Sequence, residues 1–376
     1  MAKVFLTGAS GYIGGQVLRE LSRSKTKFSI RALVRDPKKA SAIKDVFPDV
    51  RAVIGDLDNT ELLIRETADA AIVLHLAATG HLNSVKAIHQ GLSKRANSPE
   101  AYWIQVSGAS ALAAGELASP SFVPGSASET VFNDYHDVAD VQSIIRKHPA
   151  RAVDNYILDN VSTDTNIRTA LVFPPIIYGL GEGLLNQRSI QIPSLASATI
   201  KLGHGIRVGS GENRWGNVHI RDVGRVFSNL AEAAANGRND EGLWGQNALY
   251  LAGVGEVNFA EISARVAAAA KHQGLIASDK VEELRQDQYD TVLPHGKVLF
   301  GTNARGQATR ARKLLGWAPR EISLENDVER TVSEENRRAD YNKTSSFRPY
   351  ILLRRYLQAQ SEYEPLLDTF TLKIYN

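Results

Sequence analysis

Short apolar runs alternate with amphipathic segments along the first half of the chain. The apolar runs have the length of strands and end at Gly, Pro or acidic turns, and they cover residues 4–7, 28–34, 51–54, 71–78, 101–106 and 168–173. Between them, apolar residues recur at spacings of three and four, which predicts helices over 12–21, 40–46, 61–67 and 82–94. This alternation favours crossover connections, so the sequence predicts an α/β fold with a Rossmann-type doubly wound parallel sheet.

The first strand ends in a glycine-rich turn, with Gly8, Gly11 and Gly14 at the spacing of a dinucleotide-binding motif. Gly8 would permit the turn, Gly11 would let the backbone approach a pyrophosphate, and Gly14 would let the following helix pack closely. The start of that helix offers free N–H groups and the positive end of its dipole. The segment therefore predicts a dinucleotide site, and an ordinary glycine-rich strand–helix turn is the alternative.

The residue after the second strand selects between NADP(H) and NAD(H). An Asp or Glu there would accept hydrogen bonds from a ribose 2′-hydroxyl and repel a 2′-phosphate. This chain has Arg35, whose guanidinium favours a 2′-phosphate. We therefore predict NADP(H). In the alternative, Arg35 is a solvated turn residue, Asp36 accepts the ribose, and the cofactor is NAD(H).

Composition excludes several classes of function. The chain has 376 residues, 44 basic and 41 acidic, without a dense Lys/Arg block, so we expect no nucleic-acid partner. It has no cysteine, which excludes disulfides and thiolate chemistry, and no His/Asp/Glu cluster with metal spacing, so we predict no metal. No apolar run reaches the roughly 18 residues of a membrane span. Since the N-terminus enters a strand at once, we expect no signal peptide and a cytoplasmic enzyme with a small-molecule substrate.

Six motifs appear in a characteristic order along residues 3–332. They are Thr7-Gly8-Ala9-Ser10-Gly11-Tyr12-Ile13-Gly14, Gly55-Asp56-Leu57, His75-Leu76-Ala77-Ala78, Phe173-Pro174-Pro175-Ile176-Ile177-Tyr178-Gly179, Val218-His219-Ile220-Arg221-Asp222-Val223 and Lys313-Leu314-Leu315-Gly316-Trp317-Ala318-Pro319. This order resembles the extended or atypical short-chain dehydrogenases/reductases of the NAD-dependent epimerase/dehydratase superfamily. The resemblance implies a dinucleotide-binding domain over 1–180, with returning segments near 216–235, and a smaller substrate lobe mainly over 181–332.

The resemblance also implies which residues bind the cofactor. It places Gly8, Ser10, Gly11, Tyr12 and Ile13 at the pyrophosphate, Asp56 and Leu57 at the adenine, and Ala77 and Ala78 on the ribose side. Pro174 and Ile176, in the Pro-Pro segment, complete the predicted cofactor-binding set.

The chain departs from the family at its redox pair. The family uses a Tyr-x-x-x-Lys pattern, in which the Tyr exchanges the substrate proton and the Lys lowers its pKa and holds the nicotinamide ribose. No such pattern occurs in the candidate window, where the lysine position falls near Arg151 and the tyrosine position near Lys147 or His148. Arg151 would hold a ribose, but it would not shuttle protons because it does not deprotonate.

The candidate catalytic set is therefore Arg151 with two hydroxyls. Ser107 heads the turn after the fifth strand, and Ser110 is the nearest hydroxyl to the family's catalytic position, where this chain has Ala109. Asp154 follows Arg151 by three residues and is expected to pair with it. His81, after the fourth strand, is a second-rank candidate beside the alternative of a solvated loop histidine, whereas His75 is predicted to be a satisfied core residue.

The second half of the chain carries weaker signals. Helices are predicted over 189–198, 231–235 and 259–271, with a hairpin-like glycine-rich segment over 207–215. Polar groups on the side that the resemblance implies to face substrate are Gln187, Ser189, Gln191 and Arg207. An apolar extension over 333–376 is expected to pack on its own lobe, on a second copy in a homodimer, or over the pocket.

Three hypotheses of function follow. The first is an NADP(H)-dependent oxidoreductase of the atypical short-chain type that acts on a small, largely apolar metabolite. The second is a non-redox isomerase, lyase, aldolase or cyclase on the same scaffold, which the missing Tyr/Lys pair favours. The third is a dinucleotide-sensing regulatory protein without turnover.

Overall fold

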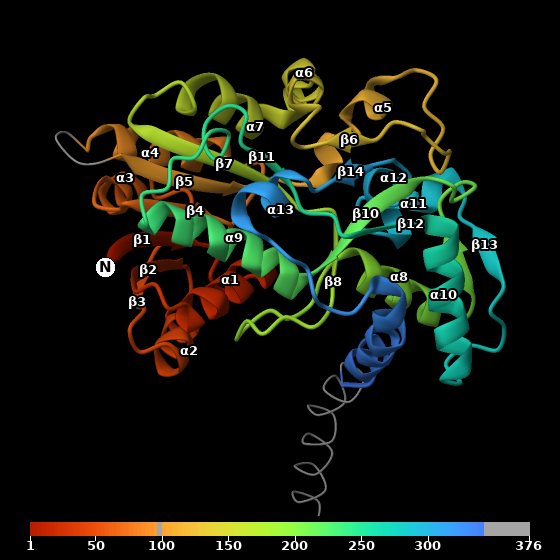
Figure 1. The fold of residues 1–376 in the computed structure, drawn as a ribbon. Helices are drawn as coiled ribbons and strands as arrows, with labels where there is room; N and C mark the ends of the chain where they lie inside the picture. The colour runs from red at the N-terminus through yellow and green to blue at the C-terminus, as the bar shows by residue number, and fades with distance from the viewer. Residues whose placement is uncertain (96–99, 342–376) are drawn as a thin grey trace, which may run out of the picture.

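The structure is a computed structural model that describes residues 1–95 and 100–341. Its centre is a seven-stranded sheet (Figure 1) in the order β11 (Leu249–Leu251), β7 (Ile167–Phe173), β5 (Ala101–Val106), β4 (Ile72–His75), β1 (Ala2–Thr7), β2 (Phe28–Val34) and β3 (Arg51–Ile54). Every neighbouring pair is parallel. The predicted doubly wound α/β fold is confirmed, and the winding direction reverses between β1 and β4, where such sheets bind ligands.

Helices cover both faces of the sheet, and successive strand residues feed two separate cores. One core lies under α1 (Tyr12–Arg23), α2 (Pro37–Val46) and α9 (Ile220–Ala235) and contains Tyr102 and Ile104 of β5. The other lies under α3 (Thr60–Ala68), α4 (Leu82–Ser93), α6 (Val138–Lys147) and α7 (Ala152–Tyr156) and contains Trp103. Because side chains alternate along a strand, a strand covered on both faces is buried throughout, as β4 and β5 are, and it is mostly apolar.

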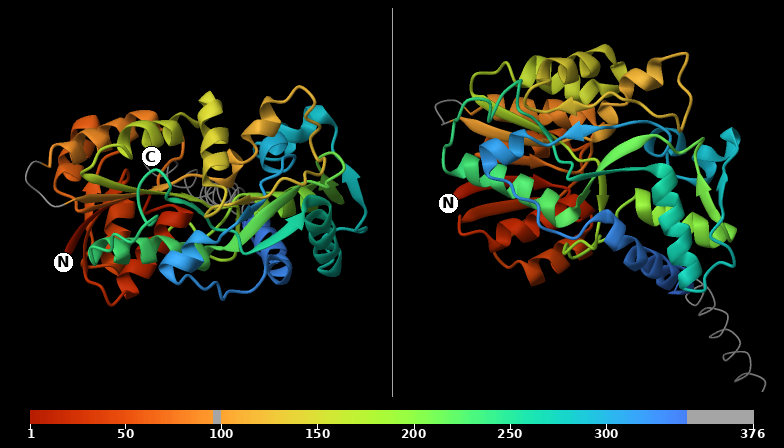
Figure 2. Two further views of the ribbon diagram at one scale, coloured as in Figure 1. Left: turned by 45° about the horizontal axis from the view of Figure 1, so that its top comes forward. Right: turned by 45° about the vertical axis from the view of Figure 1, so that its right-hand side comes forward.

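The second lobe lies beside the carboxyl edge of this sheet (Figures 1 and 2). Its three-stranded sheet has the order β12 (Gly255–Asn258), β10 (Arg214–His219) and β8 (Ile176–Tyr178). Two further pairs are β13 (Val281–Glu283) with β9 (Gly205–Arg207), and β14 (Gly306–Gln307) with β6 (Phe132–Asn133). Further α-helices are α5 (Ala114–Ala118), α8 (Gln191–Leu202), α10 (Phe259–His272), α11 (Tyr289–Val292), α12 (Gly296–Leu299) and α13 (Arg310–Leu315).

Several local predictions change in the folded chain. The expected hairpin over 207–215 does not form, because β9 and β10 pair in different sheets. The helix expected at 231–235 is the last part of α9, and the strand expected over 71–78 ends at His75, so that residues 76–79 form a turn. β11 joins the large sheet although it lies within the range 181–332 expected for the substrate lobe.

The last described segment is a helix over 324–341, which runs through the predicted boundary at 332. It is held to the second lobe by a bidentate ion pair between Arg188 and Glu335, with distances of 2.7 and 2.9 Å. The Tyr178 hydroxyl also donates to the Ile322 carbonyl, just before this helix, at 2.7 Å. The rest of the predicted extension, residues 342–376, lies outside the described residues.

Candidate functional site

The glycine-rich turn brings the start of α1 against the ends of β1 and β4. Gly8 has φ +82°, and a Cβ on it would lie 2.7 Å from the carbonyl carbon of Leu76. A Cβ on Gly14 would lie 2.1 Å from the Gly8 carbonyl oxygen. The α1 N-cap, Gly11, has no side chain to satisfy the first N–H groups of the helix. These groups therefore remain free to donate to an anion at the crevice between β1 and β4.

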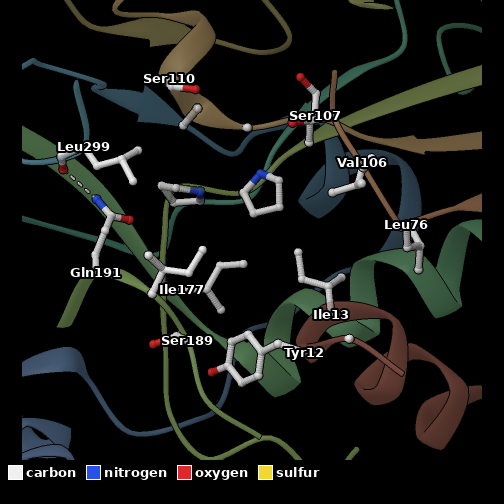
Figure 3. A pocket seen from close by; sticks show the side chains of 18 of the residues that line it. Tyr12, Ile13, Leu76, Val106, Ser107, Ser110, Ile177, Ser189, Gln191 and Leu299 are labelled. Carbon is white, nitrogen blue, oxygen red and sulfur yellow. Dashed lines mark hydrogen bonds between the residues drawn. The ribbon is translucent and has the colours of Figure 1, made fainter. Parts of the chain in front are cut away.

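A cavity of about 450 Å³ extends from this turn to the second lobe (Figure 3). It is lined by the turn, by the ends of β4 and β5 and by residues of the second lobe, and its lining is mostly apolar. The lining residues are Gly11, Tyr12, Ile13, Leu76, Ala77, Ala78, Thr79, Val106, Ser107, Gly108, Ala109, Ser110, Pro174, Pro175, Ile177, Asn186, Arg188, Ser189, Ile190, Gln191, Trp215 and Leu299.

Most of the predicted cofactor residues lie at this cavity or in the adjoining turn. Those that line it are Gly11, Tyr12, Ile13, Ala77, Ala78 and Pro174, while Gly8 and Ser10 belong to the turn itself. Ile176 is a correction: its side chain is fully buried in the core, and its neighbour Ile177 lines the cavity. Alternate residues of β8 face opposite sides, so only one of the two can reach the cavity.

The predicted adenine and 2′-phosphate residues lie beyond the cavity, at the ends of β2 and β3. Arg35 is exposed, and no described group pairs with its guanidinium. Asp36, which would accept the ribose hydroxyl in the NAD(H) alternative, caps α2 by accepting the Lys38 N–H at 2.8 Å. Asp56 is exposed with one oxygen accepting two backbone N–H groups, and Leu57 packs partly against the core.

The three candidate catalytic residues converge at the cavity wall. Arg151 Nη2 donates to Ser107 Oγ at 2.7 Å, and its Nη1 lies 3.5 Å from Ser110 Oγ. The Arg151 Nε donates to Asp154 Oδ2 at 2.8 Å, which confirms the expected pairing, and the Ser107 hydroxyl donates to the same oxygen at 3.1 Å. Ser107 and Ser110 line the cavity and Arg151 does not. The cluster therefore places a cation immediately behind two hydroxyls.

Asp154 holds this cluster from the core side. It is 1% exposed, and its second oxygen, Oδ1, has no partner in the described structure. Burial raises the pKa of the Asp154 carboxyl, while Arg151 and the Ser107 hydroxyl act in the lowering direction. The Asp154 carboxylate thus fixes the orientation of the Arg151 guanidinium. The Ser107 hydroxyl donates its only proton to the same carboxylate.

Comparisons with known proteins place this geometry in a family. Residues 8–144 match the family model described as NAD(P)H-binding. The chain is 33% identical to the oxidase ucsJ of Acremonium sp. over 340 residues, which cover 89% of this chain and 97% of the oxidase. The chain belongs to the same family as this oxidase, and its residues 8–144 are those of an NAD(P)H-binding domain.

A second relative and several solved structures also match over most of the chain, and the solved structures share its fold. The uncharacterized protein YLL056C of Saccharomyces cerevisiae is 24% identical over 332 residues, 88% of this chain and 99% of that protein. The dTDP-glucose 4,6-dehydratase of Bacillus anthracis, solved with NAD, has a TM-score of 0.61 at 15% identity, over 89% of this chain and 96% of that one. The UDP-glucuronic acid 4-epimerase of Bacillus cereus, solved with its substrate and NAD, has a TM-score of 0.60 at 13% identity, over 89% and 99%.

The helix is interrupted in the window where the Tyr-x-x-x-Lys pattern was expected. Two residues four apart share a helix face only when the helix is continuous. Here α6 ends at Lys147, and Pro149 begins a short 3₁₀ turn that ends at Arg151, just before α7. Lys147 is exposed and does not line the cavity. Arg151, which was expected near the lysine position, contacts the Ser107 and Ser110 hydroxyls instead of facing Lys147.

The histidines have structural roles. His75 is fully buried between the Thr7 hydroxyl at 2.7 Å and the Ser84 hydroxyl at 3.2 Å, as predicted for a core residue. His81 caps α4 by accepting the Ser84 N–H and lies 3.1 Å from Asp58, which supports its alternative as a loop residue. His219 caps α9 and contacts the Tyr178 ring edge-on.

The second lobe adds further polar and aromatic residues to the wall. Ser189 and Gln191 line the cavity as predicted, whereas Gln187 and Arg207 do not. Tyr12 joins the lobes, since its hydroxyl donates to the Gly179 carbonyl at 2.6 Å, and burial raises its pKa. Sequence reasoning missed Trp215 and Leu299, which reach the cavity from segments with no motif of their own.

No helix within residues 1–95 and 100–341 has both the length and the apolar character needed to cross a membrane. In the same residues, no three His, Cys, Asp or Glu side chains lie together as a metal site requires.

Proposed function

We propose that the protein is an NADP(H)-dependent oxidoreductase that acts on a small, largely apolar substrate bound in the cavity. The observation that carries this proposal is one continuous space, which joins a family-type dinucleotide turn to an apolar chamber with two hydroxyls at its edge. The 33% identity to a protein named an oxidase supports redox chemistry.

The residues present fit a dinucleotide. The free N–H groups at the start of α1 suit the diphosphate, and the bare backbone of Gly11 leaves room for its approach. Ala77 and Ala78 offer small side chains beside the ribose, and Arg35 offers an unpaired guanidinium for a 2′-phosphate. When bound, a nicotinamide dinucleotide supplies or accepts a hydride.

The chain's own groups would orient the substrate oxygen. Ser107 gives its proton to Asp154 and accepts from Arg151, so it has no proton left for a substrate. The Ser110 hydroxyl has no acceptor in the described structure and is free to donate to a substrate carbonyl or alkoxide. The charge of Arg151 behind it would stabilise negative charge on that oxygen, because a preorganised cation in a poorly solvated site loses little energy to reorganisation. The proton itself would come from solvent.

A second candidate is a non-redox isomerase, lyase, aldolase or cyclase on the same scaffold. The observation that favours it is the engagement of Arg151, whose Nε and Nη2 are already used by Asp154 and Ser107. Such chemistry would rely on the shape of the cavity to orient its substrate. A dinucleotide-sensing regulator is the third candidate, and it would bind the cofactor without turnover.

Binding of NADPH and NADH by calorimetry tests the cofactor assignment. We expect tighter binding of NADPH by the wild type, and Arg35→Glu should weaken NADPH by roughly 30-fold while sparing NADH, a loss of about 2 kcal/mol. Arg51→Glu is the matched control. Arg51 is also exposed, but it begins β3 and therefore lies at the amino ends of the strands, away from the predicted cofactor site at their carboxyl ends. Equal binding of both cofactors by wild type and Arg35→Glu would refute the NADP(H) preference.

Turnover distinguishes the three candidates. Nicotinamide absorbance is followed with a panel of small apolar ketones and alcohols. Oxidation or reduction of the cofactor, lowered by Ser110→Ala, supports the oxidoreductase. Substrate conversion without an absorbance change supports the non-redox enzyme, and cofactor binding with no conversion across the panel supports the regulator.

A further inference from the structure

The cavity wall contains one buried side-chain amide, that of Gln191, whose nitrogen has a hydrogen-bond partner and whose oxygen has none among the described residues. Gln191 begins α8, is 8% exposed, and donates from Nε2 to the Leu299 carbonyl at 2.7 Å. A carbonyl oxygen can only accept, so the amide nitrogen must face Leu299 and the amide oxygen must face away from it. Figure 3 shows this oxygen directed into the cavity. No donor among the described residues reaches it.

The surroundings of that oxygen are apolar or already hydrogen-bonded. Ile177 and Leu299 contribute aliphatic wall. Trp215 also lines the cavity, but its indole N–H donates to the Thr302 carbonyl at 2.7 Å and is unavailable to a ligand. Arg188 is neutralised by Glu335, whose side chain is 5% exposed. A ligand that fills this part of the cavity therefore meets the Gln191 oxygen beside aliphatic side chains and groups that are already hydrogen-bonded.

Filling the cavity has an energetic consequence for this oxygen. In the open cavity this oxygen is accessible to solvent water, and a ligand that excludes water without supplying a donor would leave a buried acceptor unpaired. Such a loss is typically about 1–3 kcal/mol. A ligand with a matching O–H or N–H regains the hydrogen bond, so the amide discriminates between molecules of equal shape.

We propose that Gln191 is a specificity-determining residue that accepts a hydrogen bond from a neutral O–H or N–H group of the substrate. The preferred substrate is then a small apolar molecule with two polar positions, an oxygen that contacts Ser110 and a separate donor that contacts Gln191. This inference rests on the proposed function for its substrate oxygen, but the discrimination by Gln191 is a property of binding alone.

Pairs of cyclic ketones that differ only in a hydroxyl or a methyl group test the inference. Binding is measured by calorimetry on the NADP⁺-loaded protein, and turnover is followed separately by NADPH absorbance. The wild type should bind the hydroxyl member of at least one pair about 10-fold more tightly than the methyl member. Gln191→Leu, of similar volume, should reduce that ratio to about threefold or less by weakening the hydroxyl member.

Ile177→Val is the matched control, because it alters the same wall without touching an acceptor, and it should keep the wild-type ratio. Gln191→Leu also removes the donor to Leu299, so the wild-type ratio stands as a measurement that does not depend on that variant folding. If no pair favours its hydroxyl member in the wild type, the inference is overturned. If the hydroxyl member binds more tightly but no NADPH is oxidised, the oxidoreductase proposal is overturned and the inference about Gln191 stands. If NADPH is oxidised but binding does not discriminate within any pair, the inference about Gln191 is overturned and the oxidoreductase proposal stands.

Discussion

The ion pair between Arg151 and Asp154 should be among the most strongly coupled in the protein. Asp154 is 1% exposed and the Arg151 side chain is 16% exposed, and their closest atoms are 2.6 Å apart. Asp154→Ala would leave a guanidinium in a poorly solvated site with only two serine hydroxyls as partners. Breaking a buried pair from one side costs about 3–5 kcal/mol. Because Arg151 keeps a fraction of its solvation and its serine contacts, we expect about 3 kcal/mol.

A double-mutant cycle isolates the interaction. Asp154→Ala, Arg151→Ala and the double variant are unfolded in urea and followed by tryptophan fluorescence. We expect a coupling energy of about 2 kcal/mol, since removing both partners avoids the unpaired charge that each single variant leaves. The same Asp154→Ala variant should bind NADPH normally, because the diphosphate turn lies on a different strand end.

A second pair in the same chain provides the control. Arg265 and Glu261 lie on α10 at 2.7 Å, and both side chains are close to half exposed. Their cycle should give a coupling energy below about 0.5 kcal/mol, as exposed helix pairs do. A coupling energy at Arg151–Asp154 as small as that of the exposed pair would refute the argument that burial makes Asp154 the anchor of the cluster.

Three further predictions concern stability. Gly14→Ala should cost about 3 kcal/mol in urea unfolding and abolish measurable NADPH binding, because its Cβ would overlap the backbone of Gly8, whereas Gly80→Ala, which has open space, should be neutral. Burial lowers the pKa of His75 to about 3, so only the unfolded chain protonates it below about pH 6.5, and wild-type stability should fall by about 2 kcal/mol more between pH 6.5 and 5 than that of His75→Gln. Equal pH dependence in the two proteins would exclude this linkage. Asp134→Ala should cost about 3 kcal/mol, because it removes the acceptor of three backbone N–H groups on β11 and around the start of α13; a loss under 1 kcal/mol by thermal or urea unfolding would contradict this.

The sequence alone determined the features that depend on short-range patterning. The period of apolar residues identified most strands of the large sheet and the helices between them, and the spacing of Gly8, Gly11 and Gly14 identified the turn that starts α1. These features were readable because strand and helix periods, and the conformations open to glycine, are local properties of a few consecutive residues. The pairing of Arg151 with Asp154 was readable for the same reason, since three residues separate them.

Only the tertiary structure decided which distant residues share the cavity and which way each one faces. Trp215 and Leu299 reach its wall because the second lobe folds back onto the sheet edge, which no local pattern encodes. Ile177 faces the cavity and Ile176 the core, a choice set by the register of β8 against β10. Gln191 was a polar residue on an expected side, and only the Leu299 carbonyl, 108 positions away, decides that its oxygen is the atom left for a ligand. Contacts between residues far apart in the sequence therefore determine which side chains form the site, and these contacts depend on tertiary packing rather than on local patterns.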